Sequence, residues 1–343
     1  MRNTDTCGIE ISAKEFLVRL RRGGDLQTRR TFSNTPEGCK ILVRYLQQKN
    51  RVMRVCMEST GLYGLDLALA LSEAQGIELM VANPRAVRHF AQALMKRSKN
   101  DPIDADVLEE FAARMPFQRW VRPSPTALAL RAMTRRLREL VEIQSVEKNR
   151  QHAAGLSQTT PAAVRRDLTR SLRAQERAIA RLTKQVRKLI ARDAQLSERF
   201  ELLDSIPGVG ETSAIQLLGE LAVLGPDFSA RQWVSFAGLD PREFDSGSSV
   251  HKKPRISKAG NKHLRQSLYM PALVAVRHDH HLRGFYQHLQ ANGKVKMQAL
   301  VAAMRKLLHA IHGMFRSHQR YDGSKLFRLP STSLPEVPHA SAA

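Results

Sequence analysis

The chain has 343 residues, long enough for two or three domains with their own cores, and its 55 lysines and arginines outnumber its 32 acids for a formal charge of +23. That charge favours a polyanionic partner, DNA or RNA, over a membrane surface, and no apolar run is long enough to span a bilayer. Only 6% of residues are aromatic, which favours contact with phosphates over stacking on bases.

The first third of the chain has the pattern of an α/β domain. Five segments are predicted strands: Cys7–Ile11, Glu15–Arg21, Gln27–Phe32, Val52–Met57 and Ile77–Val81. Three are predicted helices: one from Thr35 to about Gln48, Leu65–Ala74, and one that begins after Asn83-Pro84. Antiparallel strands followed by strand–helix units predict a mixed sheet within residues 1–124.

Four acids in this domain are candidate metal ligands. Asp101 and Asp104 lie at a predicted helix start, where Asp101 as N-cap and Pro102 as first helical residue would also make an ordinary cap. Glu10 and Glu58 lie in or at the end of apolar strands, where an unpaired carboxylate is costly. Convergence of these acids would favour Mg²⁺, with Mn²⁺ as the alternative.

Residues 125–200 are predicted to be a helical coiled coil. Apolar residues recur at steps of three and four along two long helical stretches, which are separated by a turn near Gly155–Pro161. Gln175 and Asp193 interrupt this apolar seam, and arginines crowd its flanks. The flanks are either a solvated charged face or a surface for dimerisation or nucleic-acid contact, and the pattern is compatible with all of these.

A glycine turn opens the next region, residues 201–325. Ile206–Ala214 contains Pro-Gly-x-Gly ahead of an apolar helix, which is typical of a helix-hairpin-helix. In that motif the backbone around Gly208 and Gly210 would face a phosphate. The alternative is a tight connection between two helices.

A serine-rich segment, Ser246–Ser249, follows. By composition it is a flexible loop, but a small hydroxyl surrounded by cations could attack a phosphodiester, and spacing alone does not choose among its three serines. The cations that follow it are candidate nucleic-acid ligands: Lys252, Lys253, Arg255 and Lys258.

The end of the chain is predicted to be helical and then disordered. Helices from Lys262 and Lys296 are predicted to build a core, and His278, His280 and His281 to form an exposed helix end. The tail, residues 326–343, is rich in Ser and Pro and is expected to be disordered from about Pro330.

Several motifs, taken together, resemble a known family. Cys7–Lys14, Met57–Tyr63, Asn83-Pro84 and Ser98–Ala105 resemble the N-terminal domain of the bridge-RNA-guided DEDD transposases, family one-ten of bacterial insertion sequences. The motifs that resemble its C-terminal transposase domain are Ile206–Gly210, Phe236–Leu239, Ser246–Ser249 and Ser257–Gly260. The match runs from about residue 6 to residue 325 with the motifs in the expected order.

The resemblance implies a RuvC-like (ribonuclease H-like) first domain and a C-terminal domain that carries a nucleophilic serine. Carried over position by position, the metal ligands are Glu10, Glu58, Asp101 and Asp104, and the nucleophile is Ser246. The family's first acid is usually aspartate, so Glu10 is a departure by one methylene. The family is thought to form a composite site between subunits, here in a dimer or tetramer, and a structured noncoding RNA pairs with target and donor DNA.

We therefore expect a DNA recombinase that moves an insertion sequence through a covalent phosphoserine. The alternatives are a metal-dependent junction nuclease that activates water and a non-catalytic architectural DNA-binding protein. Cys7, Cys39 and Cys56 form no metal spacing and indicate a reducing compartment, and the N-terminus lacks the pattern of a signal peptide, so a cytoplasmic bacterial location is expected.

Overall fold

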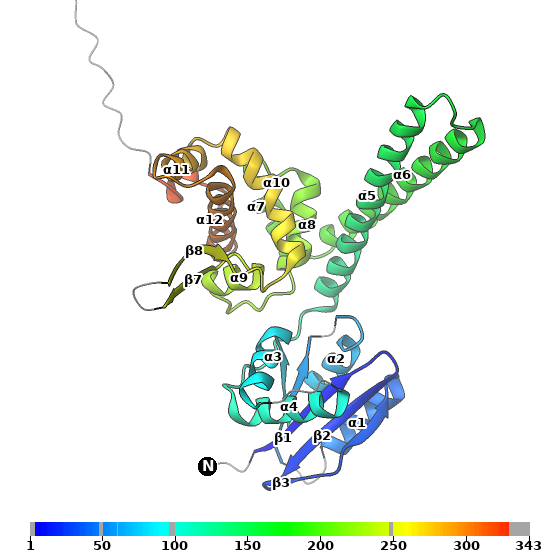
Figure 1. Cartoon of the computed structure of the whole chain (residues 1–343), viewed down its shortest axis with the longest axis vertical. Coiled ribbons are helices and arrows are strands. Elements are labelled where there is room, and N and C mark those ends of the chain that lie inside the picture. Colours follow the sequence, from blue (N-terminus) through cyan, green and yellow to red (C-terminus); the bar gives the residue numbers. More distant parts are fainter. Residues whose placement is uncertain (1–3, 48–50, 60, 96–99, 247–249, 329–343) are drawn as a thin grey trace, which may run out of the picture. The chain divides into compact units, whose positions relative to one another are not determined.

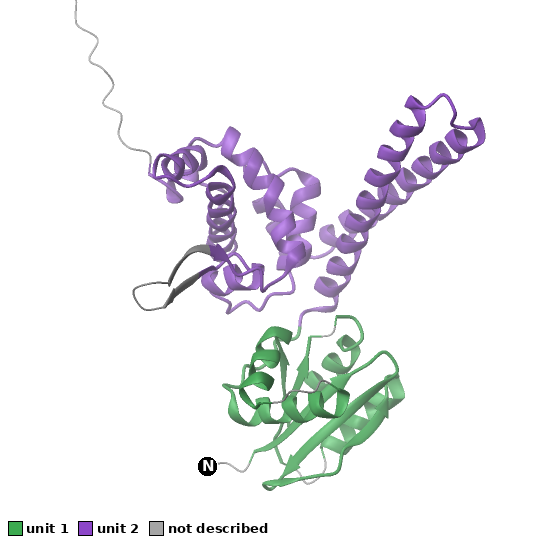
Figure 2. Ribbon diagram, in the orientation of Figure 1, with its two compact units in different colours: residues 1–122 green, residues 123–343 purple. Residues whose placement is uncertain are grey.

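The structure is a computed structural model that describes residues 4–47, 51–59, 61–95, 100–246 and 250–328, with the backbone alone over 243–254. The chain forms two compact units, residues 1–122 and 123–343 (Figure 2). The predicted boundary at residue 124 falls beside this division, and the regions predicted as 125–200 and 201–325 both lie in the second unit. The tail predicted to be disordered from about Pro330 lies outside the described residues.

A mixed sheet forms the centre of the first unit. Its strands are β1 (Asp5–Ile11), β2 (Glu15–Arg22), β3 (Asp25–Leu26), β4 (Arg30–Ser33), β5 (Met53–Glu58) and β6 (Ile77–Ala82). The order is β3-β2-β1-β5-β6, with β4 also paired to β2. Strand β1 pairs antiparallel with β2 and parallel with β5, and β5 pairs parallel with β6, as a mixed sheet requires.

The single strand predicted over Gln27–Phe32 is wrong. The first three residues of this segment, 27–29, are not strand, and β2 pairs instead with β3 before them and β4 after them. The pairing shifts by one residue between the Arg21↔Leu26 and Val18↔Arg30 pairs. A one-residue insertion of this kind leaves no mark in the apolar–polar alternation of so short and polar a segment.

Helices cover both faces of the sheet (Figure 1). These helices are α1 (Pro36–Leu46), α2 (Leu65–Glu73), α3 (Pro84–Ala93) and α4 (Asp101–Arg114). Alternate strand residues enter two separate cores: Ile9 and Val55 pack with the helices α1 and α2, whereas Cys56 packs with Val87 of α3 and Leu108 of α4. This three-layer arrangement is compatible with the ribonuclease H-like fold that the resemblance implies.

The second unit begins with a pair of long antiparallel helices, α5 (Pro125–Leu156) and α6 (Ala162–Ala191), joined by a short turn (Figure 1). Leu137 and Val186 belong to the same buried core. The apolar seam does not continue through Asp193, because that residue caps the next helix by accepting a hydrogen bond from Leu196 N at 3.1 Å.

The rest of the second unit is mainly helical. Its elements are α7 (Ala194–Asp204), α8 (Glu211–Leu221), α9 (Ala230–Ala237), β7 (Pro241–Ser246), β8 (Val250–Ile256), α10 (Lys262–His278), α11 (His280–Ala291), α12 (Lys296–Ser317) and the 3₁₀ turn η1 (Gly323–Lys325). The predicted core residues Leu264, Leu307 and Ile311 are all buried. No helix in the described part of the chain is long and apolar enough to cross a bilayer.

Candidate active site

Helix α4 lies directly on strand β1 at Gly8. A Cβ at Gly8 would lie 2.2 Å from Glu109 N and 2.3 Å from Ala105 O, so only glycine permits this approach. Thr6, two residues earlier and therefore on the same face of the strand, donates a hydrogen bond to Glu109 Oε1 at 2.5 Å. Arg21, opposite Thr6 on β2, pairs with Glu109, whereas Arg19, opposite Gly8, pairs with Asp106, so the helix runs opposite to β1.

This antiparallel crossing brings the N-terminal turn of α4 toward the carboxyl end of β1. One helical turn back from Ala105 covers about 5.4 Å and reaches Asp101. Two strand residues beyond Gly8 cover about 6.6 Å and reach Glu10. The first turn of α4, with Asp101 and Asp104, therefore reaches the level of Glu10 along the sheet.

Glu58 belongs to the same edge and the same face. Strands β1 and β5 are parallel with Gly8 opposite Cys56, so Glu10 and Glu58 occupy neighbouring positions two residues further on. Cys56 packs in the core that α3 and α4 cover, and alternation places Glu58 on that face too. Burial and the nearby Glu58 carboxylate raise the pKa of the Cys56 thiol to about 12, in agreement with this placement.

The four predicted ligands have an oxygen chemistry that suits a hard divalent cation. Glu10, Glu58 and Asp104 are half-buried, and Asp101 is exposed. Among the residues that the structure describes, however, no three His, Cys, Asp or Glu side chains are grouped closely enough to hold a metal ion. The backbone thus brings the acids to one edge of the sheet, while their side chains do not form a closed ligand set.

The predicted cap of α4 is wrong by one residue. Asn100, not Asp101, is the N-cap, and its Oδ1 accepts a hydrogen bond from Ile103 N at 3.0 Å. Asp101 is the first helical residue and Pro102 the second. Asp101 therefore does not cap the helix, and it is exposed.

An ion pair between the partly exposed Arg21 of β2 and the buried Glu109 fixes α4 to the sheet. Glu109 is 1% exposed and accepts hydrogen bonds from Arg21 Nε at 2.8 Å and Arg21 Nη2 at 2.9 Å. Sequence reasoning missed this pair. Its only signal is an acid on the face of a helix that otherwise presents Ala105, Leu108 and Ala112 to a core.

Ser246 lies at the end of a β-hairpin that the sequence did not predict. It is the last residue of β7, opposite Val250 of β8. Ser248 and Ser249 lie outside the described residues, and so do the side chains of Ser246, Lys252 and Lys253. The two described cations of this group, Arg255 on β8 and Lys258 just after it, are exposed. Of the segment Ser246–Ser249, predicted to be a loop, only the backbone of Ser246 is described, and it belongs to strand β7.

The Ser257–Gly260 motif anchors the base of this hairpin. Ser257 Oγ donates to Asp240 Oδ1 at 2.6 Å, which ties the two ends of the hairpin together. A Cβ at Gly260 would lie 2.1 Å from Phe236 O, so the chain passes against the end of α9 without room for a side chain. These residues hold the hairpin in place and do not themselves need to touch a ligand.

Asn261, the residue after this motif, is bound to a buried carboxylate, Glu220 of α8, which is 2% exposed. It accepts hydrogen bonds from Arg135 Nε at 2.7 Å, Arg135 Nη2 at 2.9 Å and Asn261 Nδ2 at 2.6 Å. Burial acts to raise the pKa of Glu220, but the hydrogen bonds from Arg135 and Asn261 outweigh it and lower the pKa. This network joins α5, α8 and the start of α10, and no local sequence pattern indicates it.

The sequence comparisons decide the family. Residues 7–161 match the family model of the IS110 DEDD transposases, and residues 200–287 match that of the transposase IS116/IS110/IS902 family. The pilin gene-inverting protein of Moraxella bovis is 30% identical over 298 residues, covering 85% of this chain and 90% of the relative.

The chain belongs to the IS110/IS116/IS902 family of transposases. The corresponding protein of Moraxella lacunata is also 30% identical over 298 residues, with the same coverage of 85% and 90%. The uncharacterized 42 kDa protein of insertion element IS900 from Mycobacterium paratuberculosis is 26% identical over 331 residues, covering 75% of this chain and 82% of the relative. The protein is accordingly a DNA transposase or recombinase, and DEDD transposases normally use divalent metal ions.

The glycine turn that contains Gly208 and Gly210 packs against α10 on one side. Gly208 has φ +92°, and a Cβ there would lie 2.6 Å from Ala275 N and 3.0 Å from Pro271 O of α10. Gly208 therefore serves a close approach between α10 and the turn. Gly210, at the start of α8, has no atom within 4 Å of a Cβ position and is the part of the turn open to a ligand.

The histidines near the end of α10 serve a helix junction. His278 and His280 are exposed, and His281 is hydrogen-bonded through its Nδ1 to Phe327 O at 2.9 Å. Between them Asp279 caps α11 by accepting from Leu282 N at 2.6 Å.

Proposed function

We propose that this transposase cuts and rejoins DNA through a phosphoserine at Ser246, with the acids Glu10, Glu58, Asp101 and Asp104 holding Mg²⁺ (or Mn²⁺), under the guidance of a structured noncoding RNA. The observation that supports the proposal is the antiparallel crossing of α4 over Gly8, which directs the first turn of α4, with Asp101 and Asp104, toward the sheet edge of Glu10 and Glu58.

In the proposed mechanism, the Ser246 hydroxyl passes its proton to water and attacks the scissile phosphorus. A bond from Oγ to phosphorus forms and the bond to the leaving oxygen of the DNA breaks; that oxygen takes up a proton from water, and the phosphodiester energy is kept in the adduct. A hydroxyl of the other strand then attacks the same phosphorus and releases the serine. When bound, the divalent ion would orient the phosphate and offset its developing charge.

The remaining residues have supporting roles in this scheme. Lys252, Lys253, Arg255 and Lys258 follow the serine on β8 and just beyond it, where cations would stabilise the transferring phosphoryl group. Glu10 is one methylene longer than aspartate, and since Mg²⁺ tolerates little deviation from its ~2.1 Å ligand distance, we propose that Glu10 binds through a slightly retracted strand or a water.

The substrate and assembly are part of the proposal. The pilin gene-inverting relatives support a substrate of two DNA sites, donor and target, brought together by the enzyme. We propose a dimer or tetramer in which the acids of one subunit act with Ser246 of another. Purifying the protein with its bound nucleic acid and sequencing it tests the guide: one discrete noncoding RNA from the flank of its own reading frame is expected, and random cellular RNA would refute guidance.

The serine is tested by trapping the adduct. Ser246→Ala should abolish the denaturation-resistant protein–DNA species, because no other group would carry the phosphoryl bond, while RNA binding persists. Ser248→Ala and Ser249→Ala are the matched controls and should retain the adduct. Loss of the adduct in one of the controls alone would move the nucleophile to that serine. Cleavage without any adduct, in the wild type, would indicate a nuclease that uses water.

The acids are tested by Asp104→Asn, which keeps size and removes charge. Strand cleavage should fall by at least about a thousandfold, as expected when a ligand of a catalytic metal is lost. Asp106→Asn is the control, since Asp106 lies on the same helix but pairs with Arg29 at 2.6 Å. Equal cleavage by the Asp104 variant and the wild type would reduce Asp104 to an acid of the first helical turn.

A further inference from the structure

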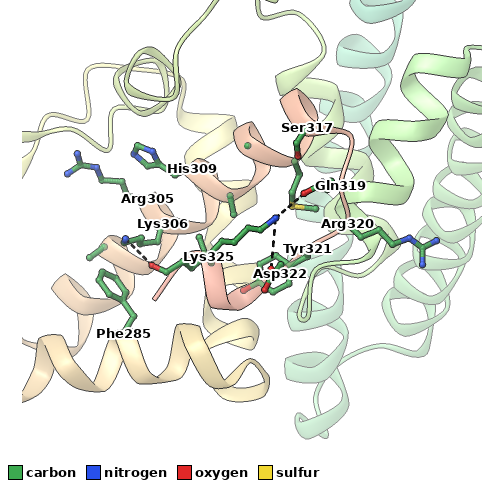
Figure 3. Close-up of a pocket in the computed structure, with 15 residues that line it drawn as sticks. Phe285, Arg305, Lys306, His309, Ser317, Gln319, Arg320, Tyr321, Asp322 and Lys325 are labelled. Atoms are coloured by element: carbon green, nitrogen blue, oxygen red, sulfur yellow. Dashed lines mark hydrogen bonds and ion pairs between the residues drawn. The ribbon is translucent and has the colours of Figure 1, made fainter. Parts of the chain in front are cut away.

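A cavity of about 650 Å³ lies in the second unit between α12 and the chain that follows it (Figure 3). Its floor is one face of α12, and its other wall is the segment from Gln319 to Leu326 with Phe285 of α11. This volume is within the range of about 300–1,000 Å³ in which proteins bind small organic groups. The described parts of the metal and serine sites contribute no residue to it.

Positive charge dominates the polar lining of the cavity. One acid, Asp322, lines the cavity together with four cations, which are Arg305, Lys306, Arg320 and Lys325. Lys306 Nζ is bound to Leu326 O at 3.1 Å, and Lys325 Nζ crosses the cavity to Gln319 Oε1 at 2.9 Å (Figure 3). Arg305 is half-buried and, within the described residues, has no hydrogen-bond or ion-pair partner.

The pKa of His309 reflects the excess of positive charge in the cavity. It lies one turn beyond Arg305 on the cavity side of α12 (Figure 3). Its pKa is lowered first by burial and then by the neighbouring cations Arg305, Lys306, His312 and Arg231, the last of them on α9. Among the described residues, no acid offsets these cations at His309. Asp322 pairs with Lys325 at 4.0 Å, which leaves an excess of positive charge in the cavity, and a concave site with such an excess fits an anionic group.

The other part of the lining is apolar. Phe285, Ala302, Ala310, Met314 and Leu326 contribute surface that would accept a flat, weakly polar group. A phosphate beside a flat aromatic group is the chemistry of a nucleotide. Inside a duplex each base is stacked and paired and cannot enter a concave pocket without being extruded.

We propose that this cavity is a binding site for an unpaired nucleotide, with Arg305 and His309 at its phosphate and the apolar wall at its base. The site rests on the proposed function only in that nucleic acid is the substrate or guide. The nucleotide can belong to a single-stranded segment or be a free mononucleotide, since both present the same chemistry. The experiment separates these two sources.

Gly313 provides a test that fills the cavity without changing charge. It lines the cavity from within α12, and a Cβ there meets no atom within 4 Å. Gly313→Leu should leave the melting temperature unchanged or raise it, since glycine destabilises helix interiors, and should weaken binding of a short fluorescent single-stranded oligonucleotide at least about tenfold. Gly155→Leu in α5, equally free of contacts, is the matched control and should bind like the wild type.

Charge variants and three probes complete the test. Arg305→Gln should weaken binding of the single strand about tenfold or more, whereas Lys296→Gln, which removes a cation from the exposed first turn of the same helix, should have little effect. The probes are the single-stranded oligonucleotide, a duplex of the same sequence and AMP. If Gly313→Leu weakens binding of the single strand alone, the cavity binds a nucleotide within a strand. If it weakens binding of AMP as well, the cavity binds nucleotides in general.

Two results would overturn the proposal. If the Gly313→Leu variant bound every probe as tightly as the wild type, the cavity would take no nucleotide. If Arg305→Gln and Lys296→Gln lowered the affinity equally, the binding would be a general attraction to charge. Adduct formation at Ser246 reports the proposed function separately. If the adduct forms normally in Gly313→Leu while oligonucleotide binding is unchanged, only the cavity proposal fails.

Discussion

At Gly8 the absence of a side chain sets the position of a whole helix. We expect Gly8→Ala to destabilise the protein by about 2 kcal/mol, because a Cβ within 2.3 Å of backbone atoms forces α4 away from β1. The same displacement moves Asp101 and Asp104, so DNA cleavage should fall as well. Chemical denaturation and a cleavage assay measure the two effects. Gly155→Ala, which meets nothing within 4 Å, should be neutral or slightly stabilising.

Glu220 gives a residue-scale prediction with a pH dependence. Glu220→Gln should cost about 2 kcal/mol of unfolding free energy at neutral pH, because it leaves Arg135 without its carboxylate partner. The pKa of Glu220 is lowered in the folded state, so its stabilisation is present above its ordinary pKa of about 4.3 and is lost as pH falls through the folded value. The variant and wild type should therefore converge in stability in acid. A constant difference down to that range would show that charge is not involved.

At the scale of elements, the start of α4 separates two roles that the sequence could not separate. Both a cap and a metal ligand favour an acid before Pro102, so the pattern alone was ambiguous. The structure assigns the cap to Asn100, whose Oδ1 accepts from Ile103 N at 3.0 Å. The interpretation of Asp101 as a cap fails for this reason, and its role as a ligand stays a prediction.

This division predicts opposite effects of two adjacent substitutions. Asn100→Ala should lower stability by about 1 kcal/mol and leave cleavage measurable, since it removes a cap. Asp101→Asn should change stability little and reduce cleavage strongly. Thermal unfolding and cleavage rates on the same preparations measure both. If Asp101→Asn instead destabilised the protein and retained full cleavage, the carboxylate would be structural.

Regular elements with a clear apolar period could be predicted from the sequence, and elements stabilised by long-range contacts could not. The strands β1, β5 and β6 and the helix α12 follow from runs of buried side chains. The hairpin β7–β8 was not predicted because Ser-Gly-Ser-Ser and Pro254 are typical of loops. Its ends are held together by the hydrogen bond from Ser257 to Asp240, a contact that no local pattern encodes.

The candidate site shows the same limit across the whole molecule. Glu10 and Glu58 could be singled out because acids in apolar strands are costly, and the sheet register then places them side by side. The supports of the site could not, because Glu109 and Glu220 are acids in helices whose partners are 88 and 85 residues away along the chain. Only the folded chain shows that these carboxylates are buried and paired.

At the scale of the molecule, the charge of +23 and the acids predict that binding and cutting depend on different ions. Affinity for DNA or RNA should fall steeply with salt, because cations of the protein displace counterions from phosphates, and it should persist in EDTA. Cleavage should vanish in EDTA and return with Mg²⁺ or Mn²⁺, because the acids alone would repel the scissile phosphate. Filter binding and cleavage measured across a salt series, with and without chelator, distinguish the two. Cleavage that survives chelation would remove the metal from the mechanism, and salt-sensitive binding without cleavage under any divalent ion would instead describe an architectural protein.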